Sequence, residues 1–208
     1  LNNRSVILTK YSLIYNGFFK KILFLLQYYK GLVIFIFMTT KLLQFVNIKK
    51  EMPKKRGSSL RLKDFNEIYN DFNKLEGKKQ AGRCSQCGIP FCQVHCPLQN
   101  NIPDWLKLAA ENRLEEAYEV SHSTNNFPEI CGSICPQDRL CEGNCVIEKG
   151  FESVTIGRVE KHITDTAWEK GWIKPLNPPK EIDKSIGIIG SGPAGLAAAE
   201  ELRKKGYK

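Results

Sequence analysis

All eight cysteines of this 208-residue chain lie in two groups between Cys84 and Cys145. The first group has the spacing Cys84-x2-Cys87-x4-Cys92-x3-Cys96-Pro97, and the second has the spacing Cys131-x3-Cys135-Pro136-x4-Cys141-x3-Cys145. Thiolates grouped in this way, with proline directly after one cysteine of each group, suit the ligation of iron–sulfur clusters. We therefore predict two clusters in this region.

Three other uses of the cysteines compete with this prediction. Two tetrahedral zinc sites of four thiolates each would also account for eight cysteines. Four disulfides would require an oxidising compartment, and buried thiols would need no ligand at all. The motif downstream favours clusters, because a cluster beside a flavin has an evident use and zinc carries no electrons.

Glu160 is a carboxylate in a helical stripe of apolar residues. At about 100° per residue it falls inside the face formed by Ile156, Val159, Ile163 and Ala167. A buried carboxylate is costly unless it is paired or binds a metal. Glu160 is therefore a candidate cluster ligand, and the alternative is that it reaches the edge of the stripe or pairs with Arg158 or Lys161. The histidines, His95, His122 and His162, are given no catalytic role.

A glycine-rich motif follows the cysteine region, with the sequence Gly190-Ser191-Gly192-Pro193-Ala194-Gly195. It fits G-x-G-x-x-G and stands between an apolar run at 186–190 and a helical pattern at 194–205. Gly190 allows a tight turn, Gly192 lets a pyrophosphate approach the backbone, and Gly195 lets helix and strand pack closely. The acidic residue that would bind a ribose falls beyond Lys208, so the motif does not choose between flavin and nicotinamide.

The remaining patterns are mostly helical. An apolar stripe predicts a helix over 60–75 capped by Ser58 or Ser59. Two short helices broken near Asn112 are expected between the cysteine groups. A further helix is expected from a Thr155 cap to about Lys170, with Gly171 as its stop. The proline-rich stretch that follows predicts a linker. We expect a mainly α protein: a helical iron–sulfur domain over 52–175, a linker over 176–184, and over 185–208 the first strand and helix of a truncated Rossmann (α/β) domain.

The net charge of +9 is confined to the N-terminal part of the chain. Residues 1–56 carry 11 Lys and Arg and one Glu, a balance of +10, whereas residues 57–208 carry 20 and 21, a balance of −1. Residues 57–208, with almost no net charge, lack the charge pattern of a nucleic-acid-binding protein. We exclude that class of function.

The N-terminal segment contains two apolar runs that lysines interrupt, at 22–29 and 32–38. Each is shorter than the ~20 residues that a transmembrane helix needs. A single tilted span over 17–38 is the alternative. We expect Met38 to be the true start, residues 1–37 to be an extension outside the working protein, and residues 38–51 to be a lead-in. A membrane association is not expected.

Several of these motifs resemble the small (beta) subunit of bacterial NADPH-dependent glutamate synthase. The resemblance covers residues 38–208 and rests on residues 84–100, 125–129 and 135–145, and on Val154-Thr155-Ile156-Gly157 with Glu160. It implies a ferredoxin-like double-cluster domain followed by an FAD domain, a module also found in dihydropyrimidine dehydrogenase. It further implies that one 4Fe–4S cluster is held by Cys84, Cys87, Cys92 and Cys145, and the other by Cys96, Cys135, Cys141 and Glu160. Cys131 is then a spare thiol or the alternative fourth ligand.

The same resemblance implies a cytoplasmic oxidoreductase subunit. NADPH would reduce FAD, and electrons would pass through two 4Fe–4S clusters to a large (alpha) subunit that makes L-glutamate from L-glutamine and 2-oxoglutarate. The cysteines are conductors in this scheme, so no catalytic residue is expected among residues 1–208. The alternatives are another iron–sulfur flavoprotein NAD(P)H oxidoreductase, similar to dihydropyrimidine dehydrogenase, and a zinc-binding interaction module.

Overall fold

The computed structural model describes residues 42–208, and all structural statements refer to that range. Its elements are a short 3-10 helix, η1 (Gln44–Val46), and the α-helices α2 (Ser58–Arg61), α3 (Lys74–Ala81), α4 (Phe91–Val94), α5 (Ile102–Ala110), α6 (Leu114–His122), α7 (Pro128–Ile134), α8 (Glu148–Phe151), α9 (Ile156–Glu169) and α10 (Pro193–Lys204). No strand is formed within residues 42–208, which agrees with the predicted mainly helical cysteine domain.

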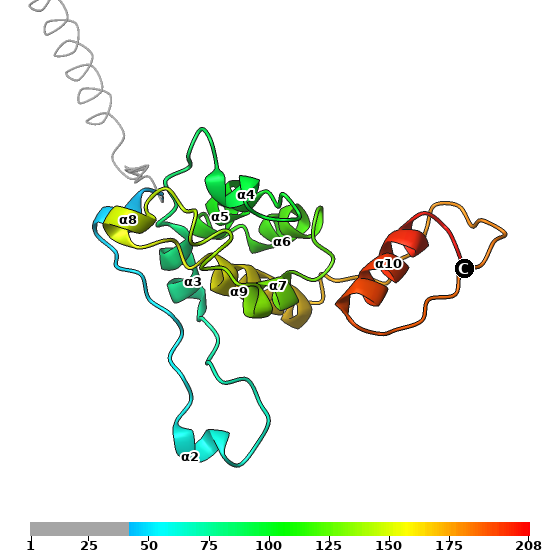
Figure 1. The fold of residues 1–208 in the computed structure, drawn as a ribbon, viewed down its shortest axis with the longest axis horizontal. Coiled ribbons are helices and arrows are strands. Elements are labelled where there is room, and N and C mark those ends of the chain that lie inside the picture. Colours follow the sequence, from blue (N-terminus) through cyan, green and yellow to red (C-terminus); the bar gives the residue numbers. More distant parts are fainter. Residues whose placement is uncertain (1–41) are drawn as a thin grey trace, which may run out of the picture. The chain divides into compact units, whose positions relative to one another are not determined.

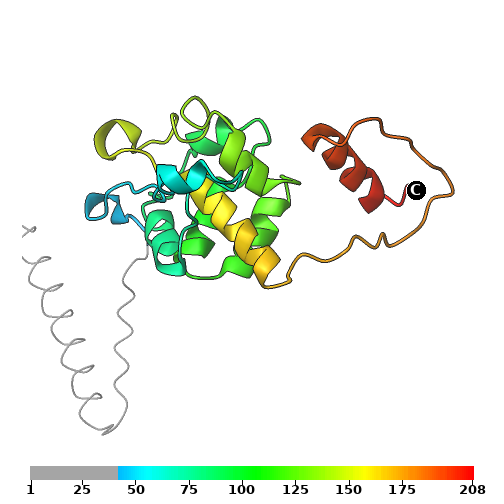
Figure 2. The same ribbon diagram turned by 90° about the horizontal axis from the view of Figure 1, so that it is seen from below.

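Helix α9 lies at the centre of the packed helices. It packs against α3, α5, α6 and α7, and Figures 1 and 2 both show α7 running beside it. The predicted apolar stripe of α9 is fully buried, with Val159, Ile163 and Ala167 each 0% exposed. Trp105 and Leu106 of α5 complete this core. The burial of these side chains holds in place the loops that carry the cysteines.

The predicted break between two short helices is confirmed. Helix α5 ends at Ala110, Asn112 adopts a left-handed conformation with φ 65°, and α6 begins at Leu114. The predicted α9 is also confirmed, with Gly171 at φ 66° beyond its end. Its predicted cap is wrong, because Thr155 Oγ1 donates to Gln80 Oε1 at 2.9 Å instead of capping the helix.

The predicted helix over 60–75 is wrong. Helix α2 ends at Arg61, and the next helix begins only at Lys74, where Asn73 and Glu76 form a reciprocal capping box. Helix α2 lies at the tip of an arm, where the bidentate pair of Arg56 with Asp64 joins the chain on either side of the helix. Leu62 and Phe65 of the predicted stripe are almost fully exposed. The capping box stabilises the start of α3, and the ion pair stabilises the loop around α2. Together these local interactions are stronger than the preference of the apolar pattern for one continuous helix.

The predicted strand at 186–190 is not formed in the described part of the chain. Ile186, Ile188 and Ile189 are exposed there. The Ile186 N–H donates to the Lys208 carbonyl at 3.0 Å, and the Lys208 N–H donates to the Lys184 carbonyl at 3.1 Å. These two slanted bonds have the pattern of a parallel pair, but one such rung does not make a strand. A buried parallel strand needs neighbours on its edges and faces. Besides this rung, the only further main-chain bond between the two segments within residues 42–208 runs from the Ile182 N–H to the Gly206 carbonyl at 2.8 Å.

The predicted linker, residues 176–184, contains no helix or strand, and its role as a domain boundary stays a prediction. None of the helices within residues 42–208 is long and apolar enough to cross a membrane. The proposed extension over 1–37 and the alternative span over 17–38 lie outside the described residues.

Candidate metal centres

The first thiol group consists of Cys84, Cys87, Cys92 and Cys145, which line one small cavity of about 20 Å³. Cys84 follows α3, Cys87 lies in the loop after it, Cys92 belongs to the four-residue α4, and Cys145 lies in a turn before α8. Three of these thiols come from the first cysteine motif and one from the second. The fold therefore mixes the two motifs in this cavity.

Arg83 ties this group to a distant part of the chain. Its side chain is fully buried and donates to four main-chain carbonyls: Nε to Ile48 at 2.9 Å, Nη1 to Ser153 at 2.5 Å, and Nη2 to Phe151 and Glu152 at 2.5 and 2.9 Å. A buried guanidinium is tolerated when its donors are satisfied in this way. Arg83 therefore fixes the chain that follows Cys145 beside Cys84.

The second thiol group lines a separate cavity of about 230 Å³. Its candidate ligands are Cys96, Cys131, Cys135, Cys141 and Glu160. Cys131 lies on α7, Cys135 ends that helix, and Glu160 lies on the neighbouring α9. Cys141 and Cys145 both lie in turns, and they line different cavities.

Glu160 is buried, with 7% of its surface exposed. Its Oε1 accepts hydrogen bonds from Asn100 Nδ2 and Asn125 Nδ2, both at 3.1 Å. Burial raises the pKa of this carboxyl to about 8, which the hydrogen bond from Asn125 opposes. The alternative of an ion pair with Arg158 or Lys161 is wrong, because Arg158 lies beside Glu67 and Lys161 pairs with Asp71 and Asp165.

The surroundings of the thiols disfavour a bare thiolate. Burial raises the pKa of Cys92 and of Cys131 to about 12, and it also raises the pKa of Cys84, Cys135 and Cys141. No Lys, Arg or His lines either cavity. A reactive cysteine needs a positive neighbour that stabilises the thiolate, whereas a metal ligand obtains that charge from the metal. The donor set fits metal ligation and not nucleophilic catalysis.

Close packing of α7 on α9 shapes the second cavity. A Cβ at Gly132 would lie 2.5 Å from the carbonyl oxygen of Gly157, so this approach requires glycine. Gln137 Nε2 donates to the carbonyls of Cys131 and Gly132 at 3.1 and 2.9 Å. Sequence reasoning did not single out Arg83, Asn100, Gly132 or Gln137. Asn100, Asn125 and Gln137 stood within segments that carried the resemblance, but no local pattern marked their roles. The contact of Arg83 with residues 151–153 and that of Gly132 with Gly157 join parts of the chain that are distant in sequence.

The glycine motif has the local geometry that was expected of Gly195. A Cβ on this residue would lie 2.3 Å from the Gly190 carbonyl oxygen, so the turn and the helix meet too closely for a side chain. Gly190 has φ 119°, a conformation that favours glycine, and Gly192 stands at the N-terminus of α10 with open space beside it. Ser191 lies in the turn before the helix, and Pro193 and Ala194 are the first two residues of α10. A helix N-terminus with accessible backbone suits a phosphate group.

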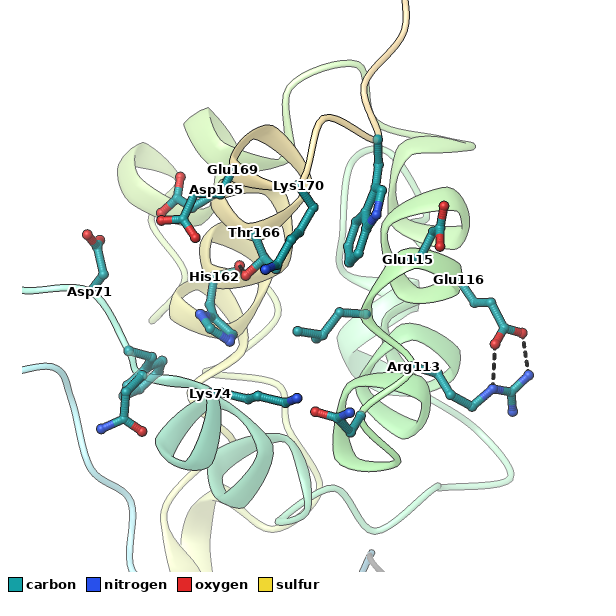
Figure 3. Close-up of a pocket in the computed structure, with 15 residues that line it drawn as sticks. Asp71, Lys74, Arg113, Glu115, Glu116, His162, Asp165, Thr166, Glu169 and Lys170 are labelled. Atoms are coloured by element: carbon teal, nitrogen blue, oxygen red, sulfur yellow. Dashed lines mark hydrogen bonds and ion pairs between the residues drawn. The ribbon is translucent and has the colours of Figure 1, made fainter.

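A larger cavity, of about 650 Å³, lies away from the thiols. Figure 3 shows charged side chains of both signs around it, including Arg113 paired with Glu116. His162 points into this region from α9, and its ring packs so closely on α3 that a Cβ at Gly77 would lie 2.5 Å from it. His95 is exposed. No cysteine lines this cavity, and we assign it no redox chemistry.

The cysteine region matches known proteins. A family model described as dihydropyrimidine dehydrogenase domain II, 4Fe-4S cluster, matches residues 61–172. The glutamate synthase [NADPH] small chain of Azospirillum brasilense is 65% identical over 169 residues, which are 81% of this chain and 35% of that protein. The protein of the same name from Escherichia coli K12 is 47% identical over 171 residues, 82% of this chain and 36% of that protein.

A putative oxidoreductase of Escherichia coli K12, AegA, is 44% identical over 155 residues, 74% of this chain and 24% of that protein. The chain thus spans about a third of the length of the glutamate synthase small chains it matches. The resemblance to these small chains, predicted from the motifs, is confirmed. Because the family model covers more than half of the chain and includes every candidate thiol, the chain belongs to the family of dihydropyrimidine dehydrogenase domain II, which carries 4Fe-4S clusters.

Proposed function

We propose that this chain is the cluster-bearing part of the small subunit of a cytoplasmic, NADPH-dependent glutamate synthase. In the full-length protein NADPH reduces FAD, and electrons pass through two 4Fe–4S clusters to the large subunit. That subunit makes L-glutamate from L-glutamine and 2-oxoglutarate. The relatives named glutamate synthase [NADPH] small chain support this function.

The observation that carries the proposal is the division of the candidate ligands between two cavities. Cys84, Cys87, Cys92 and Cys145 form one set of four, which we propose as the ligands of the first cluster. For the second cluster we propose Cys96, Cys135, Cys141 and Glu160, with Cys131 as the alternative to Glu160.

Two features favour Glu160 over Cys131. Both amide donors reach Oε1 of Glu160, and Oε2 makes no hydrogen bond among residues 42–208. The Cys131 thiol instead donates to Asn125 Oδ1 at 3.6 Å, so it already has a partner. When bound, the clusters supply one-electron redox chemistry. Among the chain's own residues, Asn100 and Asn125 would orient Glu160 as a ligand.

We further propose that residues 185–208 begin the FAD-binding Rossmann domain. Support comes from the close approach of Gly195 to Gly190 and from the single parallel rung between Lys184, Ile186 and Lys208. The Gly195→Ala variant should lose flavin because its added methyl group separates the turn from the helix. It should keep its iron, since the thiol cavities lie on other elements.

The test uses the full-length protein reconstituted with iron and sulfide. We expect about eight irons and as many sulfides per chain, one FAD, and broad visible absorption that NADPH bleaches in the absence of oxygen. A colourless protein that retains zinc would overturn the cluster assignment and favour a zinc-binding interaction module.

A second candidate is another iron–sulfur flavoprotein oxidoreductase, which the similarity to AegA favours. The two functions separate when the full-length protein is mixed with the large subunit. Oxidation of NADPH that depends on both L-glutamine and 2-oxoglutarate supports glutamate synthase. Oxidation that proceeds with artificial acceptors but never with this pair of substrates supports the second candidate.

A further inference from the structure

The segment around the first cysteine motif carries no charged side chain. Residues 84–103 contain no Asp, Glu, Lys or Arg, although these residues make up 25% of the chain. At that frequency about five would be expected in a segment of this length. Loops at a protein surface are normally polar and charged, so this segment differs from an ordinary solvated loop.

Large apolar side chains are exposed along the same segment. Ile89 is 66% exposed, Val94 61%, and Phe91 and Leu98 45% each. We call these four side chains the α4 face, because they lie on α4 and on the chain directly beside it. Figure 1 shows α4 at the outside of the packed helices. A cluster of exposed apolar residues without charges marks a surface that another molecule covers.

The α4 face adjoins both thiol groups. Phe91 lines the first cavity together with Cys87 and Cys92, and Leu98 lines the second cavity together with Cys96. A protein bound to this face would therefore be separated from either set of sulfurs by a single layer of side chains. It would also shield the sulfurs from water.

Two other occupants fit the face less well. The dinucleotide segment of the chain makes its contacts elsewhere, through Glu200 with His122 at 3.1 Å and Glu201 with Asn126 at 2.8 Å. A lipid surface attracts proteins through Lys and Arg beside apolar residues, and the segment 84–103 contains neither. The uncharged composition instead matches the core of a stable protein–protein interface.

We infer that the α4 face is the surface on which the small subunit docks to its large subunit. The inference rests on the proposed function, since that function supplies the partner. We expect the surface of the large subunit that binds this face to be apolar and uncharged as well. The arm tip around Leu62 is not part of this contact, because charged residues flank it and no thiol cavity adjoins it.

The test introduces charges of either sign at Val94, which lines neither thiol cavity. The dissociation constant of full-length small subunit and large subunit is measured for Val94→Glu, Val94→Lys and the unmodified protein. We expect both variants to bind about 30-fold or more weakly, because either charge would be buried without a partner. Leu62→Glu is the control at an exposed apolar residue outside the α4 face, 88% exposed, and should bind normally.

Iron content and the rate of NADPH oxidation with an artificial acceptor should stay unchanged in all variants. Equal affinity of both Val94 variants and the unmodified protein would overturn the docking face. Slowed reduction by NADPH in the small subunit alone would also overturn it, since the flavin domain would then cover the face. If even the unmodified subunit fails to bind the large subunit, the proposed function itself is wrong.

Discussion

The first thiol group is carried almost entirely by loops and turns, whereas the second takes two of its five candidate ligands from two closely packed helices. Cys84, Cys87 and Cys145 lie outside helices, and Cys92 lies on a helix of four residues. In the second group Cys131 and Glu160 belong to α7 and α9, which touch at Gly132 and Gly157. The first set is therefore positioned mainly by contacts between loops, and the second in part by helix packing.

The cavities differ accordingly. The second has about 230 Å³, whereas the first has about 20 Å³, which is room for about one water molecule. The larger cavity is thus the one bordered by the packed helices α7 and α9.

The largest expected effect concerns iron content, and it tests whether the groups differ in their number of cysteine ligands. Cys92→Ser should lose about four of about eight irons, because the first group has four thiols and no carboxylate to replace one. Cys131→Ser should keep all of them. The measurement is iron per reconstituted chain. Loss of about four irons in Cys131→Ser would restore an all-cysteine second site.

Variants of Glu160 test whether the second site includes a carboxylate ligand. Glu160→Ala should lose part or all of the second cluster's iron, about four per chain at most, and leave two amides without an acceptor. Glu160→Gln should retain more iron because its amide oxygen can still accept and ligate. Iron analysis and the spectrum of the reduced protein distinguish the variants. Full iron in Glu160→Ala would remove the carboxylate from the ligand set.

Arg83 tests the scaffold of the first group. Arg83→Met should lower the free energy of unfolding by about 3 kcal/mol, because four buried carbonyls lose their donor. Amide exchange should increase more at residues 148–153 than at 128–134. Arg139→Met is the control at an exposed arginine and should change stability by about 0.5 kcal/mol or less. Equal effects of the two variants in denaturant titrations would contradict this role.

Gly132 tests the scaffold of the second group, with the smallest expected effect. Gly132→Ala should destabilise by about 2 kcal/mol, since its methyl group would press on the Gly157 carbonyl. Gly150→Ala, with open space around it on α8, should be neutral or slightly stabilising. Thermal unfolding of both variants gives the comparison. A stable Gly132→Ala protein would show that α7 and α9 can separate without cost.

Sequence alone was sufficient where the signal is local. The cysteine spacing, the glycine motif, the break at Asn112 and the place of Glu160 within the α9 stripe all depend on residues a few positions apart. Periodicity failed over 60–75, because a capping box at Asn73 and an ion pair at Arg56 decided the local fold. It also failed at 186–190, where strand formation depends on neighbouring strands.

Cysteine spacing alone does not divide the eight thiols; the resemblance implied a division, and in the structure the thiols line two separate cavities. Cys96 joins the second cavity and Cys145 the first, and both changes depend on contacts between segments about 50 residues apart. Spacing indicates which thiols can meet within one short loop. It does not indicate which thiols meet when helix packing brings distant loops together. Three tertiary features bring these distant segments together. They are the burial of α9, the hydrogen bonds of Arg83 to residues 151–153, and the contact of Gly132 with Gly157.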